Sequence, residues 1–423
     1  MEINGAQMFV KALQEEHVDT LFAYPGGTAI DLFDALYDAE GIDMILPRHE
    51  QALVHAADGY ARSTGKVGVC LVTSGPGATN LVTGIATANY DSVPLVCFTG
   101  QVPMNLIGND AFQEVDIVGI TRNICKYAVT VRKREDLARI IKNAFYIART
   151  GKPGPVLVDI PKDIQLAMGS DEYPDEVNIR GYKPSEGVHS GQLKKALAEL
   201  NHAKKPVFLI GGGVNIAHAR KEMQELCELT GIPVVTTIMG KGAIPTDHPL
   251  YVGNIGMHGN LASNKAIMEC DVLFSIGTRF NDRITGTIDT FAKNAKILQI
   301  DVDPVEINKN ICVSASIIGD VKAVLTVINR RLEAQEHKEW LDTVKEYKEK
   351  YPLTYDKGRL TCPEIMEAIY DITKGEAVIT TEVGQHQMWA AQFYKYDKPR
   401  KFLTRSEERR VGKECRSRWS PYH

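Results

Sequence analysis

The sequence has 423 residues, too many for one ordinary hydrophobic core, so we expect two or three domains. Hydrophobic content of 44% and charged content of 24% are typical of a globular protein, and a net charge of -4 argues against nucleic acid or an anionic membrane as a partner. The 8 cysteines form no Cys-x-x-Cys pair, which argues against a zinc site or a disulfide framework and favours a reducing, cytoplasmic compartment. We expect no targeting segment and no membrane-spanning run.

The first part of the chain, residues 1–167, alternates apolar strands with helices. Strands are predicted over 20–24, 67–72, 94–98 and 155–161, and helices over 5–16, 29–38 and 134–148. Thr28 is expected to cap the helix over 29–38. Glycine turns follow the strands at Pro25-Gly26-Gly27, at residues 74–77 and at Thr99-Gly100. This alternation predicts a parallel α/β sheet, in which ligands bind at the carboxyl ends of the strands.

Glu50 stands at the start of one of these helices. Pro47 disfavours helical geometry at Leu46, so the helix is expected to begin at or after Arg48 and to hold Glu50 in its first turn. Residues 52–60 are mostly small or apolar, which predicts a buried helix start. Two interpretations stay open: a structural acid at a helix terminus, which is the commoner case, or an acid that exchanges a proton with a bound cofactor.

Residues 168–187 are polar and contain proline, and we interpret them as a linker. A second α/β domain follows over 188–335, with strands predicted over 206–210, 233–236, 271–276 and 296–300. The triplet Gly211-Gly212-Gly213 after the first strand either brings the backbone close to a phosphate or forms a tight turn. Arg279 and Arg283 after the third strand either clamp a diphosphate or carboxylate, or lie solvated in a loop.

The remaining chain is short. Residues 336–360 are dense in lysine and glutamate and are interpreted as a surface helix and linker, and a third unit over 361–404 has a helix over 363–372 and a strand over 377–381. This third unit is too small for a domain of similar size. Residues 405–423 lack periodicity and look like a translated sequencing adapter, so we interpret them as a non-native tail; the alternative is a genuine basic tail that binds an anionic partner.

Several motifs occur in a specific order along the chain. They are Tyr24-Pro25-Gly26-Gly27, Arg48-His49-Glu50-Gln51, Thr73-Ser74-Gly75-Pro76-Gly77-Ala78-Thr79-Asn80, Ala111-Phe112-Gln113-Glu114, Pro161-Lys162-Asp163, Met257-His258-Gly259 and Val383-Gly384-Gln385-His386-Gln387-Met388-Trp389. Over residues 1–404 the chain closely resembles the large, catalytic subunit family of acetolactate synthase (acetohydroxyacid synthase), within the thiamine-diphosphate superfamily. Phe112-Gln113-Glu114, Lys162 and Gln385-His386-Gln387-Met388 narrow the resemblance to this family.

The resemblance implies three α/β domains: a pyrimidine-binding domain over 1–167, a central FAD-binding Rossmann-like domain over 188–335, and the truncated start of a diphosphate-binding domain over 361–404. It implies thiamine diphosphate, Mg2+ and FAD as cofactors. It also implies that pyruvate is decarboxylated and that the hydroxyethyl unit is transferred to a second pyruvate or to 2-ketobutyrate, the first common step of branched-chain amino acid synthesis. In the family the Glu50 match contacts the aminopyrimidine ring and promotes loss of the thiazolium C2 proton, which favours the catalytic interpretation.

The resemblance assigns further roles residue by residue. Thiamine diphosphate contacts are implied for Pro25, Gly26, Glu50, Asn80, Gln113, Val383, Gly384, Gln385 and His386. FAD contacts are implied for Lys152, Gly211, Gly212, Gly213, Thr237, Met239, Met257, His258, Gly277, Arg279, Arg283, Asp301 and Asp320. Phe112, Lys162 and Arg279 are implied to line the substrate entry. Lys152 and Asn281 depart from the family, which usually has an arginine and an aspartate there.

No metal ligand is assigned, because the Gly-Asp-Gly…Asn motif that holds Mg2+ in the family does not occur in this sequence, and the fragment is expected to be inactive. The resemblance implies a homodimer or homotetramer and a regulatory small subunit. Two alternatives stay open. One is another flavin-containing thiamine-diphosphate enzyme, such as pyruvate oxidase or glyoxylate carboligase, although the latter lacks the Glu50 equivalent. The other is a non-catalytic nucleotide-binding module that uses Gly211-Gly212-Gly213 alone.

Overall fold

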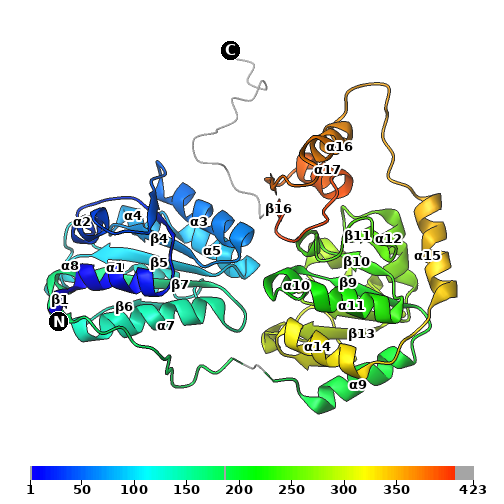
Figure 1. The fold of residues 1–423 in the computed structure, drawn as a ribbon, viewed down its shortest axis with the longest axis horizontal. Coiled ribbons are helices and arrows are strands. Elements are labelled where there is room, and N and C mark those ends of the chain that lie inside the picture. The colour runs from blue at the N-terminus through cyan, green and yellow to red at the C-terminus, as the bar shows by residue number, and fades with distance from the viewer. Residues whose placement is uncertain (1, 185–186, 405–423) are drawn as a thin grey trace. The chain divides into compact units, whose positions relative to one another are not determined.

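A computed structural model describes residues 2–184 and 187–404 (Figure 1). The chain divides into two compact units, with unit 1 ending at Lys183 and unit 2 beginning at Pro184. Each unit is built around a six-stranded parallel sheet, with strand order β3-β2-β4-β5-β7-β6 in unit 1 and β11-β10-β9-β12-β13-β14 in unit 2. The predicted fold class, successive parallel α/β sheets, is confirmed.

Unit 1 follows the predicted alternation of strands and helices. Its elements are β1 (Glu2–Asn4), α1 (Gly5–Glu15), β2 (Thr20–Ala23), α2 (Ile30–Tyr37), β3 (Asp43–Ile45), α3 (Glu50–Thr64), β4 (Gly68–Val72), α4 (Pro76–Thr79), α5 (Val82–Asp91), β5 (Leu95–Gln101), α6 (Ile117–Thr121), β6 (Tyr127–Thr130), α7 (Leu137–Arg149), β7 (Pro155–Pro161), α8 (Lys162–Leu166) and β8 (Met168–Ser170).

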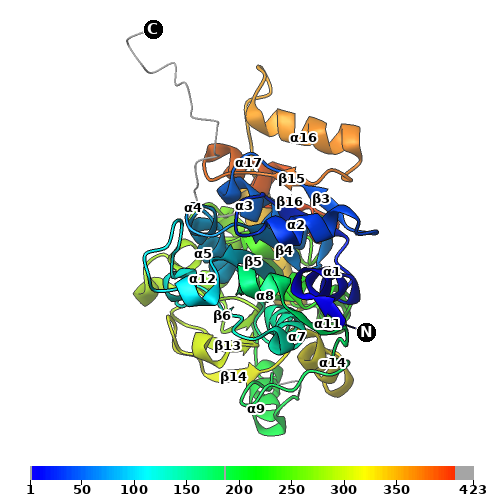
Figure 2. The same ribbon diagram turned by 90° about the vertical axis from the view of Figure 1, so that its left-hand side faces the viewer.

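Helices cover both faces of the sheet in unit 1. Helices α1, α2, α7 and α8 form one core with the sheet, and α3 and α5 form a second core on the opposite face. The first core is dense in aromatic contacts, since the rings of Phe9 and Phe98 meet edge to face at 4.9 Å. Figures 1 and 2 show α1 and α7 side by side on that face. Because both faces are covered, β4 and β5 are buried along their whole length, as their continuous apolar runs predict.

Three features of unit 1 differ from expectation. The segment interpreted as a linker over 168–187 begins with a strand, β8, which pairs antiparallel with β1. Strand β3, which ends shortly before Glu50, is an exposed edge strand that the sequence did not predict. Thr28 does not cap α2. Its hydroxyl lies 3.0 Å from the Thr73 hydroxyl and accepts a hydrogen bond from the Ser74 N–H, because a neighbouring strand-end loop offers it partners.

Unit 2 contains the second sheet and the C-terminal part of the described chain. Its main elements are α9 (Ser190–Asn201), β9 (Pro206–Ile210), α10 (Gly212–Ile216), α11 (Arg220–Thr230), β10 (Val234–Thr236), β11 (Tyr251–Asn254), α12 (Leu261–Glu269), β12 (Val272–Ile276), α13 (Asp282–Thr285), β13 (Lys296–Asp301), β14 (Ala315–Ile318), α14 (Val321–Arg331), α15 (Lys338–Lys350), α16 (Cys362–Thr373), β15 (Ile379–Thr380), α17 (Gln385–Phe393) and β16 (Phe402–Leu403). Helices α9, α10, α11 and α14 cover one face of the sheet, and α12 and α15 cover the other.

The segment over 361–404 is not isolated from the rest of unit 2. Its short strands β15 and β16 pair with each other, and Tyr394 and Tyr396 are buried. The Tyr396 N–H donates to the Thr246 hydroxyl at 2.9 Å, and the Arg220 guanidinium donates to the Asp397 carbonyl. The tail interpretation for residues 405–423 lies outside the described residues. Among the residues that are described, no helix has the length and apolar character needed to cross a membrane.

Candidate active site

Glu50 is the first residue of α3, as its sequence context predicts. The cap of this helix is His49, whose Nδ1 accepts a hydrogen bond of 3.1 Å from the Gln51 N–H, so capping does not depend on the Glu50 carboxylate. Instead, Oε2 of Glu50 accepts a hydrogen bond of 2.9 Å from Nδ2 of Asn80. The side chain is half-buried and not fully buried as expected.

The loop after β4, residues 73–80, lies beside Glu50. A Cβ on Gly77 would stand 3.5 Å from Oε1 of Glu50, so the missing side chain keeps that oxygen clear of protein atoms on this side. Gly26 of the turn after β2 lies directly against the Thr73 side chain. The Ser74 hydroxyl is buried and has no hydrogen-bond partner among the described residues. An unused buried hydroxyl beside a glycine-lined carboxylate fits a bound polar cofactor ring.

The loop over residues 102–116, here called the Gln113 loop, connects β5 to α6. Gln113 has a φ of 59°, and its carbonyl oxygen would stand 2.6 Å from a Cβ on Gly75, whose own φ is 58°. Only glycine tolerates this approach and this backbone angle at position 75. The Glu114 carboxylate accepts from the N–H groups of Gly108 and Ala111 at 2.6 and 3.3 Å. Phe112 at the loop tip is 86% exposed.

Unit 1 thus brings several of the predicted residues to one edge of its sheet. Gly26, Glu50, Asn80 and Gln113 lie on loops after β2, β3, β4 and β5 that touch one another through Thr73, Gly75 and Gly77. Exposed Pro25 precedes Gly26 in the same turn.

Lys162 follows β7 at the start of α8. Its Nζ lies 3.6 Å from the Asp31 carboxylate of α2, which forms an ion pair longer than a hydrogen bond. A substrate carboxylate at Lys162 would therefore compete with Asp31.

Asp159 was not identified from the sequence. It is 2% exposed on β7, where Thr99 Oγ1, Gln101 Nε2 and Thr130 Oγ1 donate to it at 2.7, 3.2 and 3.2 Å. Burial raises the pKa of the Asp159 carboxyl to about 6, although these hydrogen bonds oppose the shift. The available signal was an acid in the middle of an otherwise apolar strand, Pro155–Pro161.

In unit 2 the glycine triplet after β9 meets the turn after β12. A Cβ on Gly211 would overlap the Gly277 carbonyl, and the Gly213 N–H donates to that carbonyl at 3.1 Å. These contacts support the tight-turn interpretation for Gly211 and Gly213. Gly212 faces Met239 instead, whose Cβ would lie 3.1 Å from an added Cβ.

The loop after β10 carries Thr237 and Met239 beside α10. Thr237 Oγ1 accepts from the Gly240 N–H at 3.1 Å. Asn215 of α10 donates from Nδ2 to the carbonyls of Met239 and Lys241 at 3.1 and 3.0 Å. The triplet, Thr237 and Met239 are therefore held together at the carboxyl ends of β9 and β10.

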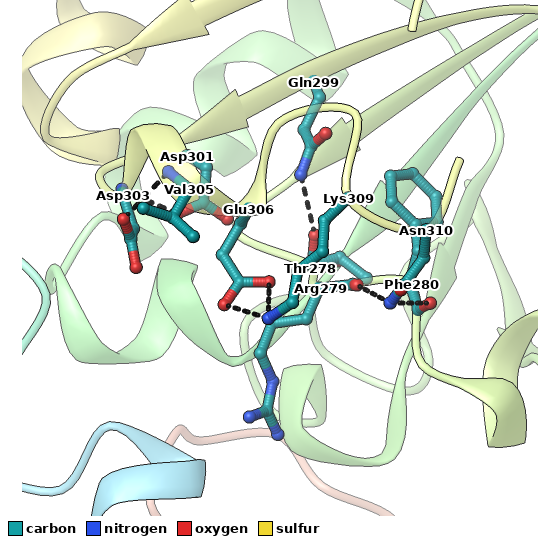
Figure 3. Close-up of polar contacts among 10 residues, drawn as sticks. All are labelled: Thr278, Arg279, Phe280, Gln299, Asp301, Asp303, Val305, Glu306, Lys309 and Asn310. Carbon is teal, nitrogen blue, oxygen red and sulfur yellow. Dashed lines mark hydrogen bonds and ion pairs between the residues drawn. The ribbon is translucent and has the colours of Figure 1, made fainter. Parts of the chain in front are cut away.

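Figure 3 shows the loops after β12 and β13. Asn310 Nδ2 donates to the carbonyls of Phe280 and Arg279, Gln299 Nε2 donates to the Thr278 carbonyl at 3.2 Å, and Oδ1 of buried Asp301 accepts from the Asp303 N–H at 2.9 Å. Thr278 Oγ1 and Gln299 Oε1 are buried without hydrogen-bond partners among the described residues. Thr278 lies in the turn after β12 and Gln299 lies within β13, so a polar ligand beside them would find unused hydrogen-bond partners.

The other predicted flavin residues are scattered. The Met257 N–H donates to the Arg283 carbonyl at 2.9 Å, and both side chains and His258 are exposed. Asp320 caps α14 by accepting from the Ala323 N–H at 2.9 Å, which gives it a structural role. Lys152 lies in unit 1, between α7 and β7.

The predicted thiamine-diphosphate residues of unit 2, Val383, Gly384, Gln385 and His386, lie at the start of α17.

Comparison with known proteins agrees with this architecture. Residues 3–120 match the N-terminal TPP-binding domain of thiamine pyrophosphate enzymes, and residues 193–328 match the central domain of the same enzymes. The two sheets with their strand-end loops therefore define a thiamine pyrophosphate enzyme.

Individual relatives narrow this class. The chain is 46% identical over 412 residues to the acetolactate synthase large subunit of Haemophilus influenzae. The aligned region covers 95% of this chain and 72% of that protein. It is 43% identical over 412 residues to the isozyme 3 large subunit of Escherichia coli, with the same coverage of 95% and 72%. It is 47% identical over 424 residues to a probable acetolactate synthase large subunit of Methanococcus aeolicus, covering 95% and 71%. The chain belongs to the acetolactate synthase large-subunit family, and the resemblance seen in its motifs is confirmed.

Proposed function

We propose that this chain is a portion of the catalytic subunit of an acetolactate synthase, an enzyme that decarboxylates pyruvate and transfers the hydroxyethyl unit to a second pyruvate or to 2-ketobutyrate. The observation that carries the proposal is the Glu50 carboxylate, held by Asn80 at 2.9 Å and facing Gly77, at a strand-end edge that also carries Gln113. Thiamine diphosphate, when bound, supplies an acidic carbon that adds to the keto group and accepts the electrons left by CO2.

Glu50 would hold a proton at the ring nitrogen of the cofactor. Because Asn80 occupies Oε2, the carboxylate is oriented and Oε1 is the oxygen directed at the glycine-lined side. Pro25 and Gly26 would line the same edge. Gln113 would contact the reacting groups, and Val383, Gly384, Gln385 and His386 would contact the cofactor from another part of the chain.

Lys162 would bind the ketoacid carboxylate, with Phe112 of the same unit as an apolar wall. Lys162 is partly exposed, with 37% of its side-chain surface accessible, so a charged substrate can reach it. The Asp31 carboxylate stabilises the ammonium in the absence of substrate, and it also opposes a second anion there.

FAD would bind in unit 2 at the ends of β9, β10, β12 and β13, and Thr278 and Gln299 offer the unused buried polar atoms. The residues with proposed flavin contacts are Lys152, Gly211, Gly212, Gly213, Thr237, Met239, Met257, His258, Gly277, Arg279, Arg283 and Asp301. Asp320 we assign to helix capping. The flavin role is structural, because the proposed reaction has no net redox step. We also propose a homodimer or homotetramer with a regulatory small subunit.

Mg2+ would hold the cofactor diphosphate. Within the described residues no group of three or more His, Cys, Asp or Glu side chains could bind a metal ion, and the sequence has no Gly-Asp-Gly. We therefore propose that residues 1–423 alone bind flavin but do not turn over pyruvate.

A paired assay tests this proposal. The first protein is residues 1–423; the second, here called the extended protein, joins residues 1–404 to the C-terminal part of the Haemophilus influenzae relative that this chain does not match. Each receives thiamine diphosphate, Mg2+, FAD and pyruvate. We expect acetolactate from the extended protein only. Acetyl phosphate or acetate as the main product would indicate a pyruvate oxidase, and flavin binding without thiamine-diphosphate binding in the extended protein would indicate a nucleotide-binding module.

A further inference from the structure

The Gln113 loop is tied to the sheet at its two ends by one buried side chain. Gln101, the last residue of β5, is 3% exposed. Its Oε1 accepts from the Val102 N–H at 2.9 Å, where the loop begins. Its Nε2 donates to the Val115 carbonyl at 3.0 Å, where the loop ends. A single amide therefore joins two points that are 13 residues apart along the chain.

Asp159 fixes which way this amide points. An ionised carboxylate can only accept hydrogen bonds, so Oδ2 of Asp159, 3.2 Å from Nε2 of Gln101, requires the NH2 end of the amide to face it. That orientation also presents an N–H to the Val115 carbonyl and leaves Oε1 for the Val102 N–H. The reversed amide would place its oxygen against two acceptors. The hydroxyls of Thr99 and Thr130 complete the acceptor sites of the carboxylate and hold it in place.

The Gln113 loop needs this tie because its middle is exposed. Phe112 and Gln113 are both solvent-exposed, and no residue between 103 and 114 is buried. Glu114 fixes the interior of the loop through Gly108 and Ala111, but it cannot fix the loop relative to the sheet. The backbone of Gln113 nevertheless lies close against Gly75. A shift of the Val115 end would therefore move Gln113 relative to the residue 73–80 loop.

We infer that Gln101, oriented by Asp159, is a positioning residue that closes the base of the Gln113 loop and so sets where Phe112 and Gln113 stand relative to Glu50 and Asn80. Its meaning for catalysis rests on the proposed function. The loop closure itself does not, and it can be measured without any cofactor.

The test compares two buried glutamines in the 423-residue chain. Gln101→Met keeps the side-chain length and apolar stem but removes all three hydrogen bonds of the amide, to Val102, Val115 and Asp159. Gln165→Met is the matched control: Gln165 is fully buried in the same unit, and its Nε2 donates two bonds of 2.8 Å, to the carbonyls of Thr28 and Ile160, neither of which belongs to the Gln113 loop. Residue-resolved hydrogen exchange is measured at the amides of Leu106, Gly108, Ala111 and Glu114, relative to β4 and β7.

We expect Gln101→Met to speed exchange at these loop amides by about tenfold relative to β4 and β7, because two hydrogen bonds are lost at the base of the loop. Gln165→Met should leave that ratio unchanged. A purely structural role would raise exchange across unit 1 equally in both variants. That outcome, or an unchanged ratio in Gln101→Met, would overturn the inference. If Gln101→Met does not fold, Gln101→Asn takes its place, since its shorter amide cannot reach both Val102 and Val115. Equal exchange increases across unit 1 in both variants, or an unchanged loop ratio in Gln101→Asn, would then overturn the inference.

Discussion

Asn80 and Glu50 lie 30 residues apart in the sequence, and Nδ2 of Asn80 donates a hydrogen bond of 2.9 Å to Oε2 of Glu50. The bond joins the start of α3 to the end of the residue 73–80 segment, which contains Gly75-Pro76-Gly77. It therefore connects the Arg48-His49-Glu50-Gln51 motif to the motif over residues 73–80, which are separate in the sequence. The bond fits both interpretations of Glu50, since a structural acid can also accept a hydrogen bond from a neighbouring loop.

The first prediction concerns this bond. In the extended protein, Asn80→Leu should lower the rate of acetolactate formation by about tenfold or more, because the carboxylate loses a charge-assisted hydrogen bond and its fixed orientation. Thr79→Val is the control, since the Thr79 hydroxyl donates to the Pro76 carbonyl within α4 and, among the described residues, no bond from it to Glu50 is present. Equal rates for Asn80→Leu and the wild type would show that the bond has no catalytic role.

The second prediction concerns the Lys162–Asp31 ion pair. Lys162→Gln should raise the KM for pyruvate by about tenfold, because the ketoacid carboxylate loses its cation. Asp31→Asn should change KM in the opposite direction, by about twofold to fivefold, because it removes a competing anion from a partly exposed pair. Steady-state kinetics of the two variants in the extended protein measure both KM values. A rise in KM for Asp31→Asn would mean that Asp31 orients the lysine and does not compete for it.

The third prediction uses the pKa of Asp159. Its folded-state pKa of about 6 lies above its ordinary value of 3.8, so the folded chain binds this proton more tightly than the unfolded chain. The stability it contributes is complete below about pH 4 and is lost as the pH rises through 6, by at most about 3 kcal/mol. Asp159→Asn should lack this dependence. The measurement is hydrogen exchange of β5 and β7 amides from pH 4 to pH 7.5, corrected for intrinsic rates, and parallel curves for the two proteins would refute the assignment.

The fourth prediction separates the two interpretations of the glycine triplet. Gly211→Ala places a methyl group on the Gly277 carbonyl and should lower the free energy of unfolding by about 1–3 kcal/mol, with loss of flavin retention as a consequence. Gly212→Ala would place its methyl group 3.1 Å from the Met239 Cβ, a tight contact but not an overlap, and should lower apo stability less than Gly211→Ala does. If Gly212 faces a flavin phosphate, Gly212→Ala still weakens flavin binding. Urea unfolding and flavin fluorescence of the 423-residue chain measure both effects, and a stable Gly211→Ala chain that retains flavin would contradict the tight-turn interpretation.

The sequence predicted the central strands well and the sheet edges poorly. Strands β7 and β9 were expected with the bounds that the structure gives them, because continuous apolar runs between turn residues leave little ambiguity. Strands β3 and β6 were missed because they are short edge strands in which no residue is fully buried, so they show no continuous apolar run. Sequence patterns report only local hydrophobic periodicity, whereas a short edge strand forms because the adjacent strand of the sheet offers it hydrogen-bond partners.

The candidate active site likewise depends on contacts between distant parts of the chain that a local sequence pattern does not predict. Glu50 was placed correctly at the start of its helix from Pro47 and the residues that follow, but the sequence pattern did not predict that its side chain is half-exposed, since burial depends on neighbours from other parts of the chain. Thr28 was expected to cap α2 and instead bonds Thr73, because that partner comes from a loop 45 residues later. Asp159 and Gln101 could not be identified as partners, since their contact depends on the pairing of β5 with β7.

The most direct test of the central claim is exchange of the C2 proton of thiamine diphosphate with deuterium, measured by NMR in the extended protein and in its Glu50→Gln variant. Glutamine keeps the shape of the side chain but cannot hold and release a proton, so we predict that the wild type accelerates exchange and that Glu50→Gln lowers the rate by about a hundredfold or more with the cofactor still bound. Exchange in Glu50→Gln at the wild-type rate would contradict the account.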